Sequence, residues 1–146
     1  MIRRPTIRTF LLIFPGGRKS KETPGFYFQL SPKEVMLAGG AYMVGKDTLL
    51  RIRTAIAREP AAIDKVLGDA AFREKYGSIK GEKNKILPKE FAEAVKKQPL
   101  IANKQFYYEA RLQPETILQN DFADVLMENY RAGKGVNAYL EGIMRP

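Results

Sequence analysis

The sequence predicts an α+β domain, with a mainly antiparallel sheet of about four strands covered by several short helices. Two observations predict this class. Apolar and polar residues alternate with period two near residues 26–30 and again at 105–112, whereas helical periodicity fills much of the stretch between them. The resulting order is a hairpin, a strand, several helices, one more strand and two helices. Doubly wound nucleotide-binding folds have a more regular alternation of strands and helices.

Three strands are expected in the first part of the chain. Residues 8–14 are apolar on both faces, which is typical of a central strand. The polar segment 15–25 separates them from the strand at 26–30, so the two strands are expected to form a hairpin with a long basic tip. A third strand is expected from Val35 to about Ala41.

Helices are expected to follow. Asp47 has the side chain of an N-cap for the first helix, and Pro60 and Asp69 are suited to begin the second and third. After the strand at 105–112, one helix is expected to begin at Asp121, and a separate final helix is expected from about Val136 to Met144.

Composition restricts the possible chemistry. A chain of 146 residues is short enough to form one domain, residues 1–146. It contains no cysteine and no histidine, which excludes disulfides, zinc–thiolate sites and every mechanism that needs an imidazole. Oxygen-ligand sites for Mg²⁺ or Ca²⁺ and carboxylate, lysine or tyrosine chemistry remain open. No motif indicates a metal or a cofactor, so none is expected.

The apolar run at residues 10–14 is too short for a secretory signal, and no stretch approaches the roughly 20 apolar residues of a membrane span. We therefore expect a cytoplasmic protein with no membrane partner. The formal charge is +9, and the N-terminal segment carries a basic patch of Arg8, Arg18, Lys19 and Lys21. This charge favours an anionic small molecule, an acidic partner or nucleic acid. The alternative is that it serves only solubility.

Five residues are candidates for a ligand site. Gly39 and Gly40 stand at a strand end, where glycine often marks the close approach of a ligand or of another backbone. Tyr42 is expected to form one wall, Arg53 to reach in from the next helix, and Lys104 to orient the ligand. Arginine at such a place would bind a carboxylate or phosphate through two hydrogen bonds. The alternative is that the glycines only make room for a helix crossing the sheet.

A second surface favours nucleic acid. If their strands are neighbours, Gln29, Lys104, Tyr107 and Arg111 share the outward face of the sheet, and single-stranded nucleic acid binds by stacking on aromatic rings over a basic surface. The usual ribonucleoprotein signatures are absent from the sequence.

Seven short segments together are similar to one known family. Their order and spacing resemble the bacterial family of domain of unknown function 2461, over nearly the whole chain. The segments are Pro24–Leu30, Leu37–Met43, Leu50–Ile56, Phe72–Arg73, Leu87–Phe91, Pro99–Ile101 and Lys104–Tyr107. That family typically has a longer N-terminal part with a signature of the form R-x-x-R-D-x-R-F, which this chain lacks. The resemblance therefore implies that the chain corresponds to about the C-terminal two thirds of a family-type domain. It implies no activity.

The sequence favours a non-catalytic binding domain for an anionic small molecule or partner. One alternative is an enzyme of unknown reaction, whose catalytic residues lie in the N-terminal segment that the resemblance implies is missing. Another is non-specific nucleic-acid binding, which would weaken strongly with salt. The oligomeric state is left open.

Overall fold

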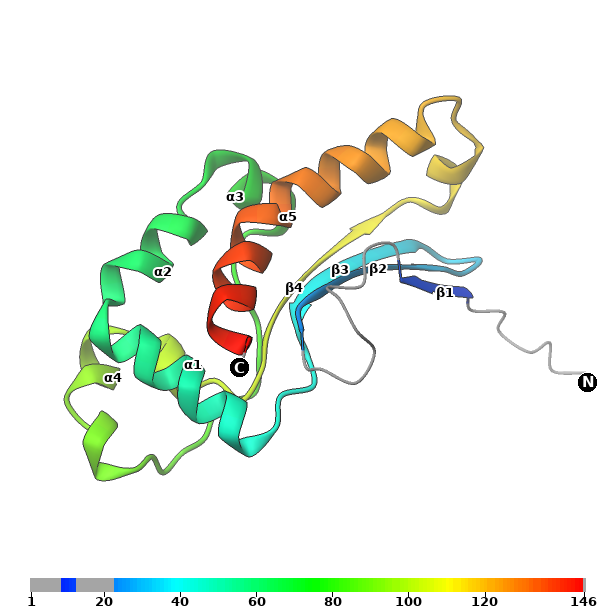
Figure 1. Cartoon of the computed structure of the whole chain (residues 1–146). Coiled ribbons are helices and arrows are strands. Elements are labelled where there is room, and N and C mark those ends of the chain that lie inside the picture. Colours follow the sequence, from blue (N-terminus) through cyan, green and yellow to red (C-terminus); the bar gives the residue numbers. More distant parts are fainter. Residues whose placement is uncertain (1–8, 13–22, 146) are drawn as a thin grey trace, which may run out of the picture.

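The computed structural model describes residues 9–12, as backbone, and residues 23–145 (Figure 1). The strand order in the sheet is β1-β2-β3-β4, and all neighbouring strands are antiparallel. The strands are β1 (Thr9–Leu12), β2 (Gly25–Leu30), β3 (Val35–Ala41) and β4 (Phe106–Leu112). The α-helices are α1 (Lys46–Arg58), α2 (Pro60–Leu67), α3 (Ala70–Tyr76), α4 (Ala94–Lys97) and α5 (Phe122–Met144). Three short 3₁₀ helices complete the described elements: η1 (Lys89–Phe91), η2 (Pro99–Ala102) and η3 (Pro114–Leu118).

The structure confirms the α+β class and the antiparallel sheet. One expectation about the sheet is wrong. Residues 8–14 were expected to form a central strand, but among the described strands β1 pairs only with β2 and lies at an edge. β3 is central, because it pairs with β2 over Val35–Gly40 and with β4 over Val35–Ala41.

The local signals for α2 and α3 are confirmed. Pro60 is the first residue of α2, a position whose backbone N–H has no partner within the helix, so the N–H that proline lacks is not needed there. Gly68 follows the last turn. The Asp69 carboxylate accepts a hydrogen bond of 3.1 Å from the Phe72 backbone N–H and so caps α3. The helix α1 begins two residues earlier than expected. Its N-cap is Gly45, and its first turn contains Asp47.

The final two helices expected from the sequence are a single helix, α5. It passes through the region of Gly133 and Gly135 without a break, although glycine is unfavourable in a helix interior by about 1 kcal/mol relative to alanine. In Figure 1 α5 runs diagonally over the sheet, and it packs against β3, α1, α2 and α3. It therefore closes the core from one side and connects the sheet to the helical end of the domain.

The core lies between the sheet and these helices. Phe26, Leu37, Phe106 and Tyr108 face it from the strands, and each is fully buried. From the helices come Ile52, Ile56, Ile63, Phe72, Val136 and Leu140, each at most 2% exposed. Among the described residues, none of the helices combines the length and apolar character needed to cross a membrane. The N-terminal basic patch of Arg8, Arg18, Lys19 and Lys21 lies outside the described residues.

Candidate functional site

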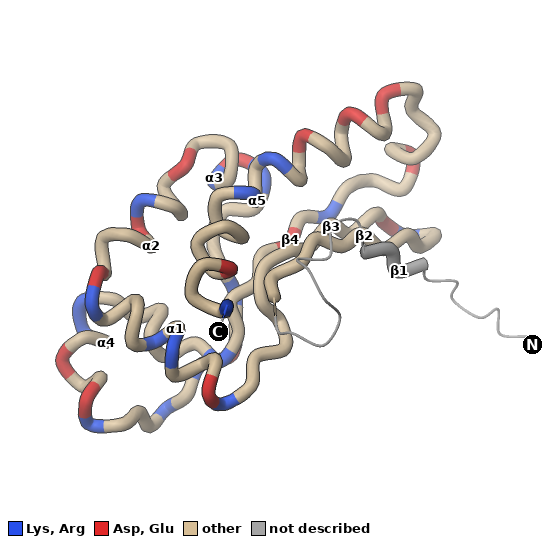
Figure 2. Tube along the Cα trace, viewed as in Figure 1, with Lys and Arg blue, Asp and Glu red and all other residues tan. Residues whose placement is uncertain are grey.

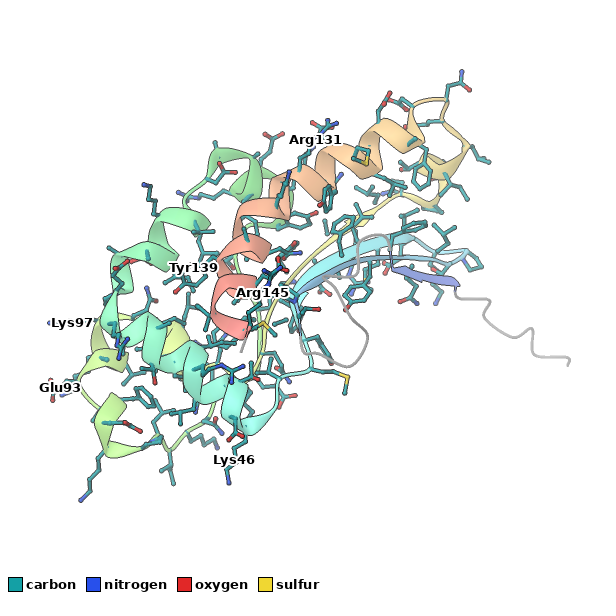
Figure 3. All side chains as sticks on the ribbon, viewed as in Figure 1. Lys46, Glu93, Lys97, Arg131, Tyr139 and Arg145 are labelled. Carbon is teal, nitrogen blue, oxygen red and sulfur yellow. The ribbon has the colours of Figure 1, made fainter. Side chains whose placement is uncertain are left out.

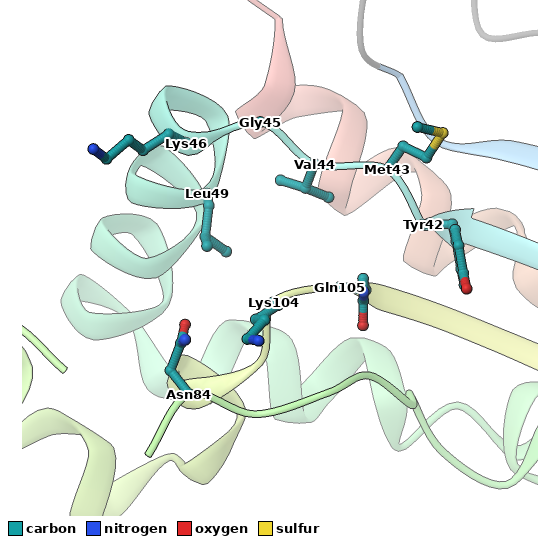
Figure 4. A pocket seen from close by; sticks show the side chains of 9 residues that line it. All are labelled: Tyr42, Met43, Val44, Gly45, Lys46, Leu49, Asn84, Lys104 and Gln105. Atoms are coloured by element: carbon teal, nitrogen blue, oxygen red, sulfur yellow. The ribbon is translucent and has the colours of Figure 1, made fainter. Parts of the chain in front are cut away.

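An open groove of about 800 Å³ lies at the beginning of α1 (Figure 4). It is bordered by the connection from β3 to α1 on one side and by the segment that leads into β4 on the other. Its surface is mostly apolar. The lining residues are Tyr42, Met43, Val44, Gly45, Lys46, Leu49, Asn84, Lys104 and Gln105.

Backbone hydrogen bonds hold two distant segments together at the base of the groove. The N–H of Asn84 donates to the Ala102 carbonyl at 2.8 Å, and the N–H of Lys104 donates to the Glu82 carbonyl at 2.7 Å. The Gln105 side chain accepts from the Glu82 N–H at 2.8 Å. The loop around residue 84 is therefore fixed to residues 102–105, although about twenty residues of chain separate them. This pairing places Asn84 opposite Ala102 and Lys104 opposite Glu82, and both Asn84 and Lys104 line the groove.

Arg53 is buried directly behind this wall. Its side chain is only 7% exposed, and its Nη2 atom donates to Asn84 Oδ1 at 2.6 Å, to the Ala102 carbonyl at 3.2 Å and to the Asn103 carbonyl at 3.1 Å. Arg53 was expected to reach into a pocket over Gly39 and Gly40. It instead fixes α1 to the loop at residue 84, and one side chain, Asn84, separates its guanidinium from the groove.

The positive charge of Arg53 is not neutralised inside the described part of the protein. Its three acceptors there are all neutral oxygens, and no carboxylate of the described residues forms an ion pair with it. Burial lowers the pKa of the guanidinium from its usual value, because desolvation penalises the charged form. Arginine nevertheless stays protonated in proteins. Arg53 therefore places a positive charge directly beside the groove.

Two lysines lie at the groove itself. Lys104 forms an ion pair with Glu82, with a Nζ–Oε2 distance of 3.7 Å, but the Glu82 side chain is 73% exposed. Exposed ion pairs are weak, about 0–1 kcal/mol, so this carboxylate can be displaced readily. Lys46 lies at the rim, with its ammonium turned outward in Figure 4, whereas Leu49 and Asn84 point into the groove. An exposed lysine reorients at low cost.

An aromatic pair forms the other end of the groove. The rings of Tyr42 and Tyr107 have centroids 5.1 Å apart and planes inclined by 60°. Tyr42 is 59% exposed, and the neighbouring Met43 is 83% exposed. Of the five candidate residues from the sequence, the structure places Tyr42 and Lys104 at this groove.

The two candidate glycines do not form the floor of that surface. A Cβ at Gly39 would overlap the ring and hydroxyl of Tyr108, which is fully buried. A Cβ at Gly40 would overlap the Phe106 carbonyl, and its φ of 91° is one that side chains disfavour. Both glycines are therefore explained by packing against β4. The alternative from the sequence, that they make room for a helix crossing the sheet, names a different packing partner.

The second candidate surface is also differently arranged. β3 lies between β2 and β4, so Gln29 is not on a strand next to that of Tyr107 and Arg111. Arg111 forms ion pairs with Glu34 and Glu109. A surface whose cations pair with its own carboxylates offers little attraction to a phosphate backbone.

Comparison with known proteins assigns the family. The model of the conserved hypothetical protein family DUF2461 matches residues 4–139. The chain belongs to this family. No curated protein and no solved structure matches the chain significantly.

The described part of this DUF2461 domain holds no cluster of acidic residues suited to a metal ion. Of the groove residues, sequence reasoning identified Tyr42 and Lys104 but missed Lys46, Leu49 and Asn84. The signal for Asn84 was weak, since it lies in a lysine- and glycine-rich loop with no periodicity. Lys46 and Leu49 could have been found, because they follow the glycine before α1, one helical turn apart.

Proposed function

We propose that this DUF2461 domain is a non-catalytic binding domain and that it binds an anionic small molecule in the groove at the beginning of α1. One observation carries the proposal. The charge of Arg53 is buried behind the groove with only neutral acceptors among the described residues, and Lys104 and Lys46 add two cations at its surface. None of the nine described residues that line the groove is acidic.

The distribution of charge over the domain supports the same site (Figure 2). Residues 80–104 contain seven lysines against three glutamates. Residues 113–130, which include η3 and the beginning of α5, contain four acidic residues and no lysine or arginine. In Figure 2 these acidic residues gather along the start of α5, at the far end of the domain from α1 and α4. An anion is therefore repelled from one end and attracted to the end that carries the groove.

Thermal unfolding with inorganic phosphate and pyrophosphate tests the proposal, against sodium chloride at matched ionic strength. A ligand at a hundred times its Kd stabilises a folded protein by about 2.7 kcal/mol, which is a readily measured rise in Tm. No rise in Tm with either anion at millimolar concentration, beyond the rise with chloride, would refute the proposal.

A matched pair of variants locates the site. Lys104→Gln is expected to weaken anion binding about tenfold or more, because a hydrogen bond to a charged group contributes about 1.5–3 kcal/mol. Lys97→Gln removes the same charge from the exposed end of α4, away from Lys46 in Figure 3, and is expected to leave binding unchanged. Equal weakening by both variants would show that net charge alone attracts the anion.

A further inference from the structure

The groove has more room and more apolar surface than an inorganic anion requires. Ligand sites for small organic molecules typically have volumes of about 300–1,000 Å³ and mostly apolar walls with a few polar groups. The groove has a volume of about 800 Å³ and a mostly apolar lining. Its cationic groups are restricted to one part of that lining.

The two chemistries are contributed by different residues. Tyr42, Met43, Val44 and Leu49 give the groove its apolar surface, and its polar groups come from Asn84, Gln105 and the two lysines. In Figure 4 Tyr42 lies at one end of the groove and Asn84 near the other, with Leu49 above Asn84. A ligand that contacts both parts must itself have an anionic end and an apolar body.

The exposed apolar residues at the groove indicate what form that body takes. Large apolar side chains that remain exposed in a folded domain commonly mark a binding surface. Tyr42 and Met43 are 59% and 83% exposed although both line the groove. The Tyr42 ring is supported from one side by the ring of Tyr107, so it presents a stacking surface whose orientation is already restricted. Methionine adapts its shape to irregular ligands.

We propose that the ligand is a small organic anion with a flat apolar body, which lies against Tyr42 and Met43 while its anionic group lies between Lys104, Lys46 and Asn84. This inference rests on the proposed anion-binding function and specifies the class of ligand. The charge of Arg53 behind Asn84 favours the anionic end at that position. Contacts with Tyr42 and Met43 at the other end of the groove add to the affinity for such a ligand, and inorganic phosphate cannot make them.

Isothermal titration calorimetry with three probes separates the two proposals. Phenyl phosphate carries both parts of the expected ligand, inorganic phosphate carries only the charge, and phenol carries only the ring. Phenyl phosphate is expected to bind at least tenfold more tightly than inorganic phosphate, with no measurable binding of phenol. Equal affinity for the two phosphates would overturn the further inference and leave the proposed function intact. If phenol bound as tightly as phenyl phosphate, or if none of the probes bound, both proposals would be overturned.

Variants then assign the two parts of the ligand to the two parts of the groove. Tyr42→Ala is expected to weaken the binding of phenyl phosphate severalfold and to leave the affinity for inorganic phosphate unchanged. Lys104→Gln is expected to weaken the binding of both. Leu118→Ala is the matched control, because Leu118 is 80% exposed on η3 and does not line the groove. A Tyr42→Ala protein with unchanged phenyl phosphate affinity, or a Leu118→Ala protein with reduced affinity, would refute the placement of the ring.

Discussion

The buried Tyr108 gives the sharpest test of the packing, because two glycines on different elements lie against its ring. Gly133 on α5 and Gly39 on β3 would each place a Cβ in contact with the hydroxyl, the adjoining ring carbon and one further ring carbon. Gly142 lies in the same helix as Gly133, but it is exposed and a Cβ there would meet nothing within 4 Å. The two positions in α5 therefore differ in packing and share their helical backbone.

Substitution by alanine at Gly142 and at Gly133 is expected to change the free energy of unfolding in opposite directions. Gly142→Ala is expected to stabilise the domain by up to about 1 kcal/mol, which is the helix propensity difference between the two residues. Gly133→Ala gains the same helix-propensity contribution, but overpacking of a core lowers the free energy of unfolding by about 1–3 kcal/mol. Because several atoms of Tyr108 would overlap the new methyl group, we expect the upper part of this range and a net loss of about 1–2 kcal/mol.

Urea unfolding followed by circular dichroism measures both variants, with an unchanged m-value as the sign that only stability has changed. In a Tyr108→Leu background, the cost of Gly133→Ala is expected to fall, because the atoms that it overlaps are absent. Gly39→Ala is expected to lose stability in the same way from the strand side. The reasoning fails if Gly133→Ala is as stable as Gly142→Ala, or if the Tyr108→Leu background leaves its cost unchanged.

Three further predictions concern stability. Arg53→Met should lower the free energy of unfolding by about 3 kcal/mol, because three buried acceptors lose their donor. Amide hydrogen exchange should become faster in residues 82–84 of this variant. Unchanged exchange there would contradict the role of Arg53. Burial raises the pKa of both Tyr76 and Tyr108 above the usual value of 10. The unfolded state therefore loses these protons first, so stability is constant below about pH 10 and falls above it, by up to about 1.4 kcal/mol per pH unit for each tyrosine. Urea titrations between pH 8 and 11 measure this loss, and a Tyr108→Phe protein with the same slope would contradict it. Asp69→Ala should lower the free energy of unfolding by about 1 kcal/mol, because the backbone N–H of Phe72 loses its hydrogen-bond acceptor. Asp69→Asn should retain most of the wild-type stability in the same urea assay. An equal loss in both variants would contradict capping by Asp69.

The elements predicted correctly from the sequence are those whose signals are local. Pro60 and Asp69 mark the starts of α2 and α3 because their effects depend on the next three residues alone. The single helix α5 was missed because Gly133 resembles a helix end in the sequence. Only the structure shows why glycine is needed there, since the reason is the ring of Tyr108, which lies twenty-five residues earlier in the chain.

The same distinction applies to the groove. Tyr42 and Lys104 could be predicted because an exposed aromatic residue after a strand and a lysine before one are visible in the sequence. The position of Arg53 could not, because its partners at residues 84, 102 and 103 come from segments about thirty to fifty residues away. Periodicity predicts which face of α1 is buried. It does not predict that a charged residue on that face binds a loop.

The helix α5 also has a consequence for how the protein is made. It is the most C-terminal of the described elements, and it contacts the sheet and three other helices. At translation rates of about 5–20 residues per second, its 23 residues take roughly 1–5 s to synthesise. Until α5 has been synthesised and has emerged, the face of the sheet that it covers has no α5 packed against it. A chain truncated before α5 is therefore expected to expose this apolar face and to aggregate.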